Sequence, residues 1–416
     1  MFPKTIERLS GLEQWQRVLY IMLVAQFVTA TGFSTANTFL PLYIDSLPQR
    51  SGLSLELMAG LLYSVPAFSM MISSPLWGVL ADRYGRKMMV QRSMYGGAIV
   101  IPLMGFAQFA EQLVLLRGIQ GMLTGTLAAA SALLAATTPR NRSGYAMAVL
   151  QVGLLAGIAL GPLLGGVVAD VFGYRTAFIG ASILLAISGI LVQFGIKEER
   201  GEQTTASRTE SDGFFRQLRK ITKIPGILLV YLLRFISELA RIIMLPILPL
   251  FVLALVSADA PVNTITGIVV ATASFAGTAS AIYLGRLGDR IGHKRILALC
   301  ALTAGLLYLA QSRVLTVWQL VALQILLGIA GGGILPIVSA LLAQYVQAGQ
   351  EGGAYGLDNS IRAAAGVTAP MLGGVIAYWL DLRSVFIATG VVLVLMAAIA
   401  ALKLPALNHD EAASDT

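Results

Sequence analysis

The chain has 416 residues, of which 56% are hydrophobic and only 12% are charged. Water-soluble domains carry about a quarter charged residues, so this composition excludes a soluble fold with a polar surface. The net charge of +8 would suit nucleic-acid binding, but the placement of the basic residues argues for a membrane protein instead.

Long apolar segments recur along the whole chain. A helix needs about 20 apolar residues to cross the hydrocarbon core, and lipid offers the backbone no hydrogen-bond partners, which favours helices. We predict an all-α integral membrane protein with 12 transmembrane helices, at residues 17–45, 54–80, 88–108, 111–136, 142–170, 175–196, 224–255, 263–285, 295–313, 316–343, 353–380 and 383–403.

The basic residues are distributed unequally between the two sides of these spans. If both termini lie on one side, that side holds 21 of the 29 Lys and Arg residues, and the opposite loops hold 4. Loops rich in Lys and Arg stay in the cytoplasm, so we expect cytoplasmic termini in a cell (inner) membrane and no nucleic-acid partner. Residues 1–16 are polar, and no cleavable signal peptide is expected.

The chain divides into two halves that repeat each other. Residues 197–223 are rich in Glu, Arg, Thr and Ser and predict a cytoplasmic linker between a first six-helix bundle (1–196) and a second (224–416). Within the linker, residues 214–223 are either a short amphipathic surface helix or a solvated segment. A duplicated, pseudo-symmetric pair of bundles predicts a substrate site near the membrane midplane that opens alternately to each side.

A charged ten-residue motif appears in both halves. Residues 78–87 read Gly-Val-Leu-Ala-Asp-Arg-Tyr-Gly-Arg-Lys, and a similar segment follows 207 residues later at 285–294. The first copy resembles the loop after the second helix of major facilitator superfamily transporters, which implies that fold and a latch stabilising one transport state. A simple positive-inside anchor is the alternative. The latch residues would be Gly78, Asp82, Arg83, Gly85, Arg86, Lys87, Gly285, Asp289, Arg290 and Gly292.

Two further motifs resemble the same superfamily. The segment 116–121, Leu-Arg-Gly-Ile-Gln-Gly, is similar to a motif whose intramembrane arginine is linked to proton transfer, here Arg117; a structural ion pair is the alternative. Glycines four residues apart followed by Gly-Pro in the fifth span resemble the motif of antiporters and drug exporters, and imply the multidrug-efflux branch. They also predict close helix packing at Gly157, Gly161, Pro162, Gly165 and Gly166. The same packing is predicted at Pro370, Gly373 and Gly374, which repeat Pro162, Gly165 and Gly166 at an offset of 208 residues.

Charged residues inside the spans are the main functional candidates, because each costs about 3 kcal/mol at the bilayer centre. They are Arg117, Arg234, Glu238, Arg241, Asp358 and Arg362. Glu238 can pair with Arg234 or Arg241, which share its helix face. Burial favours a protonated carboxylate and an arginine favours an ionised one, so Glu238, and then Asp358, are proton-coupling candidates or purely structural partners.

The remaining candidates are polar or aromatic side chains on spans, which would line a substrate cavity. They are Gln26, Asn37, Tyr63, Gln151, Phe235 and Asn359, with Arg234, Arg241 and Arg362 as charged members. Arg362 either contacts substrate or reaches Asp82 of the other half as a latch. The first span has no acid between Arg17 and Asp45, unlike drug exporters that place one there.

These observations predict a secondary active transporter, a proton-coupled exporter of amphiphilic small molecules that works by alternating access. A symporter or facilitator for a defined metabolite, such as a sugar or organic anion, is the alternative, since four arginines outnumber two acids inside the spans. We expect no enzyme and no cofactor beyond the proton gradient, because no catalytic constellation or ATP-binding loop is present. The single cysteine, Cys300, excludes a thiolate metal site, and a monomer is expected.

Overall fold

The structure is a computed structural model, and it describes residues 13–196, 224, 226–257, 259–346 and 351–404, without the side chains of residues 82, 140, 351 and 352. The predicted linker 197–223 lies outside this part. The helices are α2 (Gln14–Thr38), α3 (Leu40–Asp45), α4 (Leu55–Tyr84), α5 (Arg86–Met104), α6 (Ala110–Leu123), α7 (Thr126–Thr137), α8 (Ser143–Phe172), α9 (Tyr174–Gly195), α11 (Ile227–Ile242), α12 (Met244–Leu255), α13 (Val262–Ile291), α14 (His293–Gln311), α15 (Val317–Gly331), α16 (Ile334–Tyr345), α17 (Glu351–Trp379) and α18 (Leu382–Lys403), with a 3-10 turn, η1, at Arg140–Arg142.

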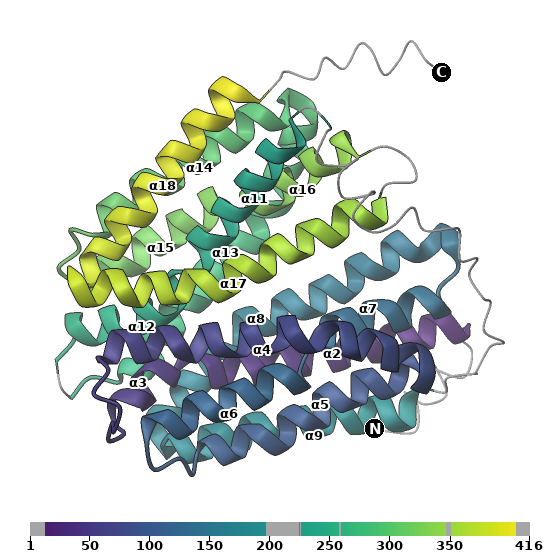
Figure 1. Cartoon of the computed structure of the whole chain (residues 1–416), viewed down its shortest axis with the longest axis horizontal. Coiled ribbons are helices and arrows are strands. Elements are labelled where there is room, and N and C mark those ends of the chain that lie inside the picture. Colours follow the sequence, from purple (N-terminus) through teal and green to yellow (C-terminus); the bar gives the residue numbers. More distant parts are fainter. Residues whose placement is uncertain (1–12, 197–223, 225, 258, 347–350, 405–416) are drawn as a thin grey trace.

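These helices form long rods that cross the molecule (Figure 1). The pairs α2–α3, α6–α7, α11–α12 and α15–α16 each continue one rod across a short break. In the described part of the chain, 11 rods are long and apolar enough to cross a membrane. The third predicted span, α5, is not among them because its first two turns carry Arg86, Lys87 and Arg92. It nevertheless packs along α9, as expected for a membrane-spanning helix. The predicted all-helical membrane architecture is confirmed.

The rods pack as two bundles. Helices α2 to α9 form the first bundle, and α11 to α18 form the second, which lies above it in Figure 1. Each core contains a pair of buried aromatic rings: Phe39 meets Phe178 with centroids 4.9 Å apart, and Phe251 meets Phe386 at 4.7 Å. Each bundle therefore buries apolar side chains in a core of its own.

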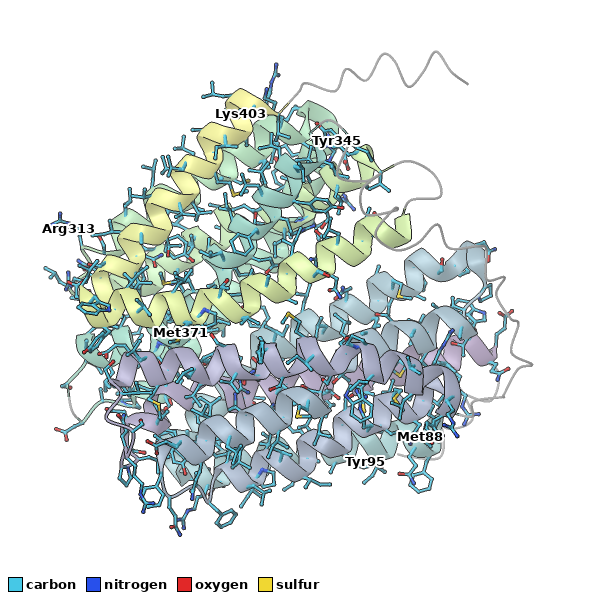
Figure 2. The ribbon with its side chains drawn as sticks, viewed as in Figure 1. Met88, Tyr95, Arg313, Tyr345, Met371 and Lys403 are labelled. Carbon is cyan, nitrogen blue, oxygen red and sulfur yellow. The ribbon has the colours of Figure 1, made fainter. Side chains whose placement is uncertain are left out.

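Two ends of the molecule have to be distinguished. We call the end at which α2 begins, α9 ends, α11 begins and α18 ends the linker side, and the opposite end the far side. In Figure 2 the labelled Lys403 lies at the linker side of the second bundle, and Arg313 lies at its far side.

On the far side the bundles touch along two seams, α8 against α13 and α4 against α17. In both seams, a β-carbon added to a glycine of one helix would lie 2.2–2.8 Å from a carbonyl oxygen of the other helix. These contacts join Gly166 to Asn263, Gly267 to Pro162, Gly374 to Glu56 and Gly60 to Pro370, and Met371, labelled in Figure 2, lies in the second seam. The helices therefore meet backbone to backbone, which only glycine permits.

Toward the linker side the same helix faces separate. Gln151 lies eleven residues, or about three turns, before Pro162 on α8, so it points toward the other bundle as Pro162 does. Asn359 has the same relation to Pro370 on α17. Both side chains are exposed, whereas the two prolines are buried. The bundles thus diverge toward the linker side, as the ribbons at the right of Figure 1 do.

Candidate functional site

The second bundle carries an ion-pair network at membrane depth. Asp358 of α17 accepts from Arg234 of α11 at 2.7 Å through Oδ1 and from Arg362 at 2.9 Å through Oδ2. The Arg234 side chain is 1% exposed, and it also donates to the Ser339 hydroxyl of α16 at 2.6 Å. Arg234 thereby joins α11 to both α17 and α16, and the carboxylate of Asp358 compensates its buried charge.

The second carboxylate of the network is Glu238, one turn farther along α11. Its Oε2 accepts from Arg241 Nη2 at 2.7 Å and from Nε at 3.0 Å. Spacing alone allowed Glu238 to pair with either arginine of its helix; it pairs with Arg241, because Arg234 is held by Asp358. Glu238 itself is buried.

Two members of this network reach an open surface. The side chain of Arg241 is 54% exposed and that of Arg362 is 43% exposed. A guanidinium at this depth cannot face lipid, so these two arginines require water between the diverging bundles. The buried carboxylates of Glu238 and Asp358 therefore contact arginines that border a water-accessible space, and this space is open toward the linker side.

A separate cluster surrounds Arg117 in the first bundle. Arg117 is 5% exposed. Its Nε donates to the carbonyl oxygen of Leu62 at 2.9 Å, and its Nη1 donates to Asn37 at 2.8 Å and to Gln120 at 2.7 Å. The ring of Tyr63 lies 5.6 Å from the guanidinium carbon, and its hydroxyl donates to the Asn37 carbonyl at 2.7 Å. Each of these hydrogen bonds of Arg117 is thus to a neutral group.

The two clusters lie at different depths. Arg117 is seven residues, about 10 Å, from the far-side start of α6, whereas Glu238 is eleven residues, about 17 Å, from the linker-side start of α11. The proton-coupling candidates Arg117 and Glu238 are therefore not brought together in this conformation. Among the polar candidates, Gln151 and Asn359 lie on the diverging faces, Phe235 is half-buried, and Gln26 is buried within the first bundle.

The repeated ten-residue motif forms the turns α4–α5 and α13–α14 on the linker side. Gly85 and Gly292 end the first helix of each turn with φ of +97° and +98°, a conformation that favours glycine. Lys87 then donates to the carbonyl of Ile196 at the end of α9, and Lys294 donates to that of Leu404 at the end of α18. Both lysines thereby cap a helix C-terminus within their own bundle.

The predicted latch is only partly visible. Arg86 donates to the carbonyl of Ala132 on α7 at 2.9 Å, and its counterpart His293 lies 3.2 Å from Asp289. The side chain of Asp82 lies outside the described residues. Arg362 pairs with Asp358 on its own helix, and its pairing with Asp82 stays a prediction.

The glycine motif of α8 faces two helices. Added β-carbons at Gly157 and Gly165 would lie 2.5 and 2.6 Å from carbonyl oxygens of α2, and one at Gly161 would lie 2.5 Å from Ser34 of α2. Gly166, next to Gly165, faces α13 of the other bundle instead. The motif therefore packs α8 against α2 of its own bundle and against α13 of the other bundle.

Sequence reasoning missed Asp170, in the last turn of α8. Its carboxylate accepts hydrogen bonds from Asn263 and Thr264 at the start of α13 in the other bundle. The only signal was an acid one turn after Gly166 at the end of a span, and its partner lies 93 residues away.

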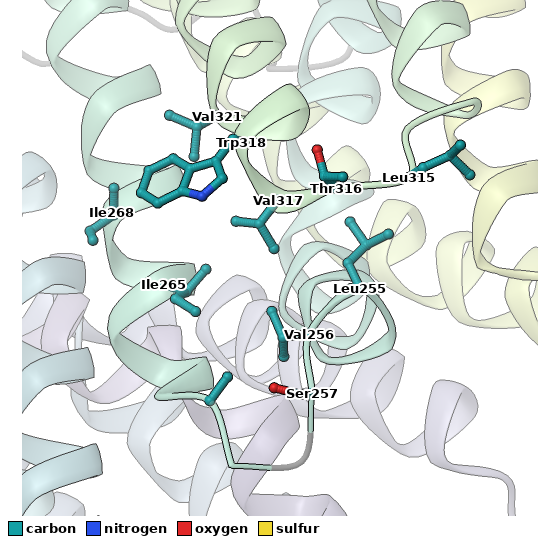
Figure 3. A pocket seen from close by; sticks show the side chains of 11 residues that line it. Leu255, Val256, Ser257, Ile265, Ile268, Leu315, Thr316, Val317, Trp318 and Val321 are labelled. Atoms are coloured by element: carbon teal, nitrogen blue, oxygen red, sulfur yellow. The ribbon is translucent and has the colours of Figure 1, made fainter.

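An apolar cavity of about 310 Å³ lies on the far side of the second bundle, between the end of α12 and the starts of α13 and α15 (Figure 3). Its walls are mostly aliphatic, and the ring of Trp318 forms part of them. None of its described lining residues is charged or belongs to the ion-pair network. Among the described residues, no group of three or more His, Cys, Asp or Glu side chains could hold a metal ion.

Comparisons with known proteins agree with this architecture. A family model described as Major Facilitator Superfamily matches residues 22–255 and 230–415. Multidrug resistance protein MdtG of Dickeya zeae (strain Ech586) is 36% identical over 402 residues, which cover 96% of this chain and 98% of that protein. The protein of the same name from Salmonella heidelberg (strain SL476) is 37% identical over 381 residues, covering 91% and 93%.

Two solved structures share the fold. A bacterial homolog to the human lysosomal transporter Spinster, inward-facing and unoccupied, has a TM-score of 0.75 at 16% identity and covers 94% of this chain and 97% of its own. The nucleoside transporter NupG, in a mutant form, has a TM-score of 0.72 at 14% identity, covering 93% and 99%. Together with the matched family model, these similarities show that the chain belongs to the Major Facilitator Superfamily.

Proposed function

We propose that the protein is a proton-coupled secondary transporter that exports amphiphilic small molecules by alternating access. The observation that carries the proposal is the ion-pair network of α11 and α17, in which two arginines at membrane depth have side chains that are 54% and 43% exposed. The similarity to multidrug resistance proteins over nearly the whole chain supports export of drug-like molecules.

We infer that the linker side faces the cytoplasm. The 21-to-4 distribution of basic residues follows the positive-inside rule. With that orientation, the bundles are closed toward the outside at the two seams and diverge toward the cytoplasm. The conformation then corresponds to the step at which substrate enters from inside the cell.

Glu238 is the carboxylate best suited to carry the proton. Protonation of Glu238 breaks one ion pair, and the side chain of its partner, Arg241, is already 54% exposed. Protonation of Asp358 would end two, and would leave the buried Arg234 without its counter-charge. A proton on Glu238 would release Arg241 toward the open space between the bundles, which gives a route from proton binding to substrate binding.

The charge of the candidate site bears on the substrate. The ion-pair network holds three arginines and two carboxylates, so the site has a positive excess that favours amphiphiles carrying an acidic group. The same excess suits the second candidate function, a facilitator or symporter for one organic anion. The two differ in selectivity and in their need for a proton gradient.

Inverted membrane vesicles that contain the protein separate these functions. Three fluorescent amphiphiles of matched size, one anionic, one zwitterionic and one cationic, are added after a proton gradient is established. Export predicts accumulation that a protonophore abolishes and that chemically unrelated amphiphiles inhibit. Accumulation that survives the protonophore, and that only one class of metabolite inhibits, would instead identify a facilitator. Vesicles from cells with an empty vector provide the background.

A further inference from the structure

Asp170 forms a polar connection between the two bundles on the far side. Its Oδ2 accepts from the backbone N–H of Thr264 at 2.7 Å. Its Oδ1 accepts from the side-chain amide of Asn263 at 2.7 Å and from the backbone N–H of the same residue at 3.3 Å. Asp170 belongs to α8 of the first bundle, while both partners belong to the first turn of α13 in the second.

The carboxylate of Asp170 supplies a hydrogen-bond acceptor that the start of α13 otherwise lacks. The first N–H groups of a helix have no partner within it, and a carboxylate there is favoured by both hydrogen bonding and the helix dipole. The N-cap of α13 is Pro261, whose side chain cannot accept a hydrogen bond. The cap of one bundle is thus supplied by the other.

Close packing allows this short side chain to reach across. Gly166 lies one turn before Asp170 on the same face of α8, and an added β-carbon there would lie 2.2 Å from the carbonyl oxygen of Asn263. A larger residue at 166 would therefore move the carboxylate away from α13.

The other far-side seam is built differently. The repeat offset of 208 residues places Tyr378 of α17 where α8 has Asp170, so that seam has no acid at this position. The helix equivalent to α13 is α4, which is capped by its own Ser54, whose hydroxyl accepts from the N–H of Leu57 at 3.4 Å. The cross-bundle cap is therefore specific to the seam between α8 and α13.

From this geometry we propose that Asp170 is a latch that holds the far side closed. Opening that side separates the ends of α8 and α13, which breaks the three hydrogen bonds of the carboxylate and exposes the uncapped start of α13. The latch therefore favours the conformation open toward the linker side. This inference rests on the alternating-access cycle proposed above, but on neither the proton site nor the substrate.

The test measures the conformational equilibrium directly, by pulsed electron paramagnetic resonance of spin-labelled protein in lipid nanodiscs, without substrate or proton gradient. One labelled pair, Gln108→Cys and Arg313→Cys, spans the bundles on the far side. Another, Ala136→Cys and Ala343→Cys, uses exposed alanines at the linker-side ends of α7 and α16. The background carries Cys300→Ala, which removes the single native thiol.

Asp170→Ala is compared with Asp381→Ala, a matched control. Asp381 caps α18 on the same side of the membrane, with Oδ1 accepting from the N–H of Ser384 at 2.6 Å, but cap and helix belong to one bundle. Asp170→Asn keeps the size of the side chain, so it provides a second test if Asp170→Ala fails to fold. Asn263→Ala removes only the side-chain donor.

Hydrogen bonds to charged groups are strong enough that losing the latch shifts the ratio of far-side-open to far-side-closed molecules by about tenfold or more. We expect this shift in Asp170→Ala, a smaller one in Asp170→Asn and Asn263→Ala, and none in Asp381→Ala. Both labelled pairs must report it, one lengthening and the other shortening. An unchanged ratio in Asp170→Ala, or an equal shift in Asp381→Ala, would overturn the latch. Because no transport is measured, either result is independent of the proposed export activity.

Discussion

The substitution Asp358→Asn is predicted to destabilise the second bundle far more than Glu238→Gln does. Both carboxylates are buried and each bonds arginine, but their partners differ. Arg234 is 1% exposed and would be left as an uncompensated buried charge, which costs about 3–5 kcal/mol. Arg241 is 54% exposed and would be solvated instead, so the loss at Glu238 is about 1 kcal/mol or less.

The assay is unfolding of the purified protein in mixed detergent micelles with increasing dodecyl sulfate, followed by circular dichroism. A double variant, Asp358→Asn with Arg234→Gln, removes the buried charge together with its partner. We expect it to regain at least half of the stability lost in Asp358→Asn, since the two residues are directly coupled. Equal losses in the two single variants, or no recovery in the double variant, would refute this account of the network.

Three further predictions concern residues outside the network. Gly166→Ala places a β-carbon 2.2 Å from a carbonyl oxygen and costs about 1–3 kcal/mol in the same unfolding assay, whereas Gly180→Ala, with nothing within 4 Å, is neutral or stabilising. Arg117→Lys cannot reproduce the three hydrogen bonds of the guanidinium and lowers transport in vesicles by about tenfold or more, at unchanged protein level. Asp381→Ala costs about 0.5–2 kcal/mol at neutral pH. Hydrogen bonds from the hydroxyl and backbone N–H of Ser384 hold the pKa of Asp381 below its usual range, so this cap stabilises above about pH 4 and the difference from wild type vanishes as pH falls through the lowered pKa.

Much of the architecture could be predicted because it depends on local or repeated sequence features. Apolar segment length predicted the spans, including α5, whose polar first turns make it the least apolar rod. The repeat offset related Pro162 to Pro370 and Gly166 to Gly374, and the structure places both pairs in the far-side seams.

Pairings over long sequence distances could not be predicted. Helical spacing left Glu238 with two possible partners, and the choice depends on Asp358, which lies 124 residues from Arg234. The hydrogen bond from Asn263 to Asp170 joins residues that are 93 positions apart in the sequence and belong to different bundles. Such contacts follow from how the bundles meet, and a single sequence carries no local pattern for them.

The most direct test of the account is proton movement in proteoliposomes that contain the purified protein and a pH-sensitive dye. An amphiphile transported in the vesicle assay is added, and wild type is compared with Glu238→Gln and with Asp381→Asn as a control carboxylate outside the network. The account predicts substrate-dependent proton movement in wild type and in the control, and none in Glu238→Gln. Full proton movement in Glu238→Gln, or substrate flux without proton movement in wild type, would contradict it.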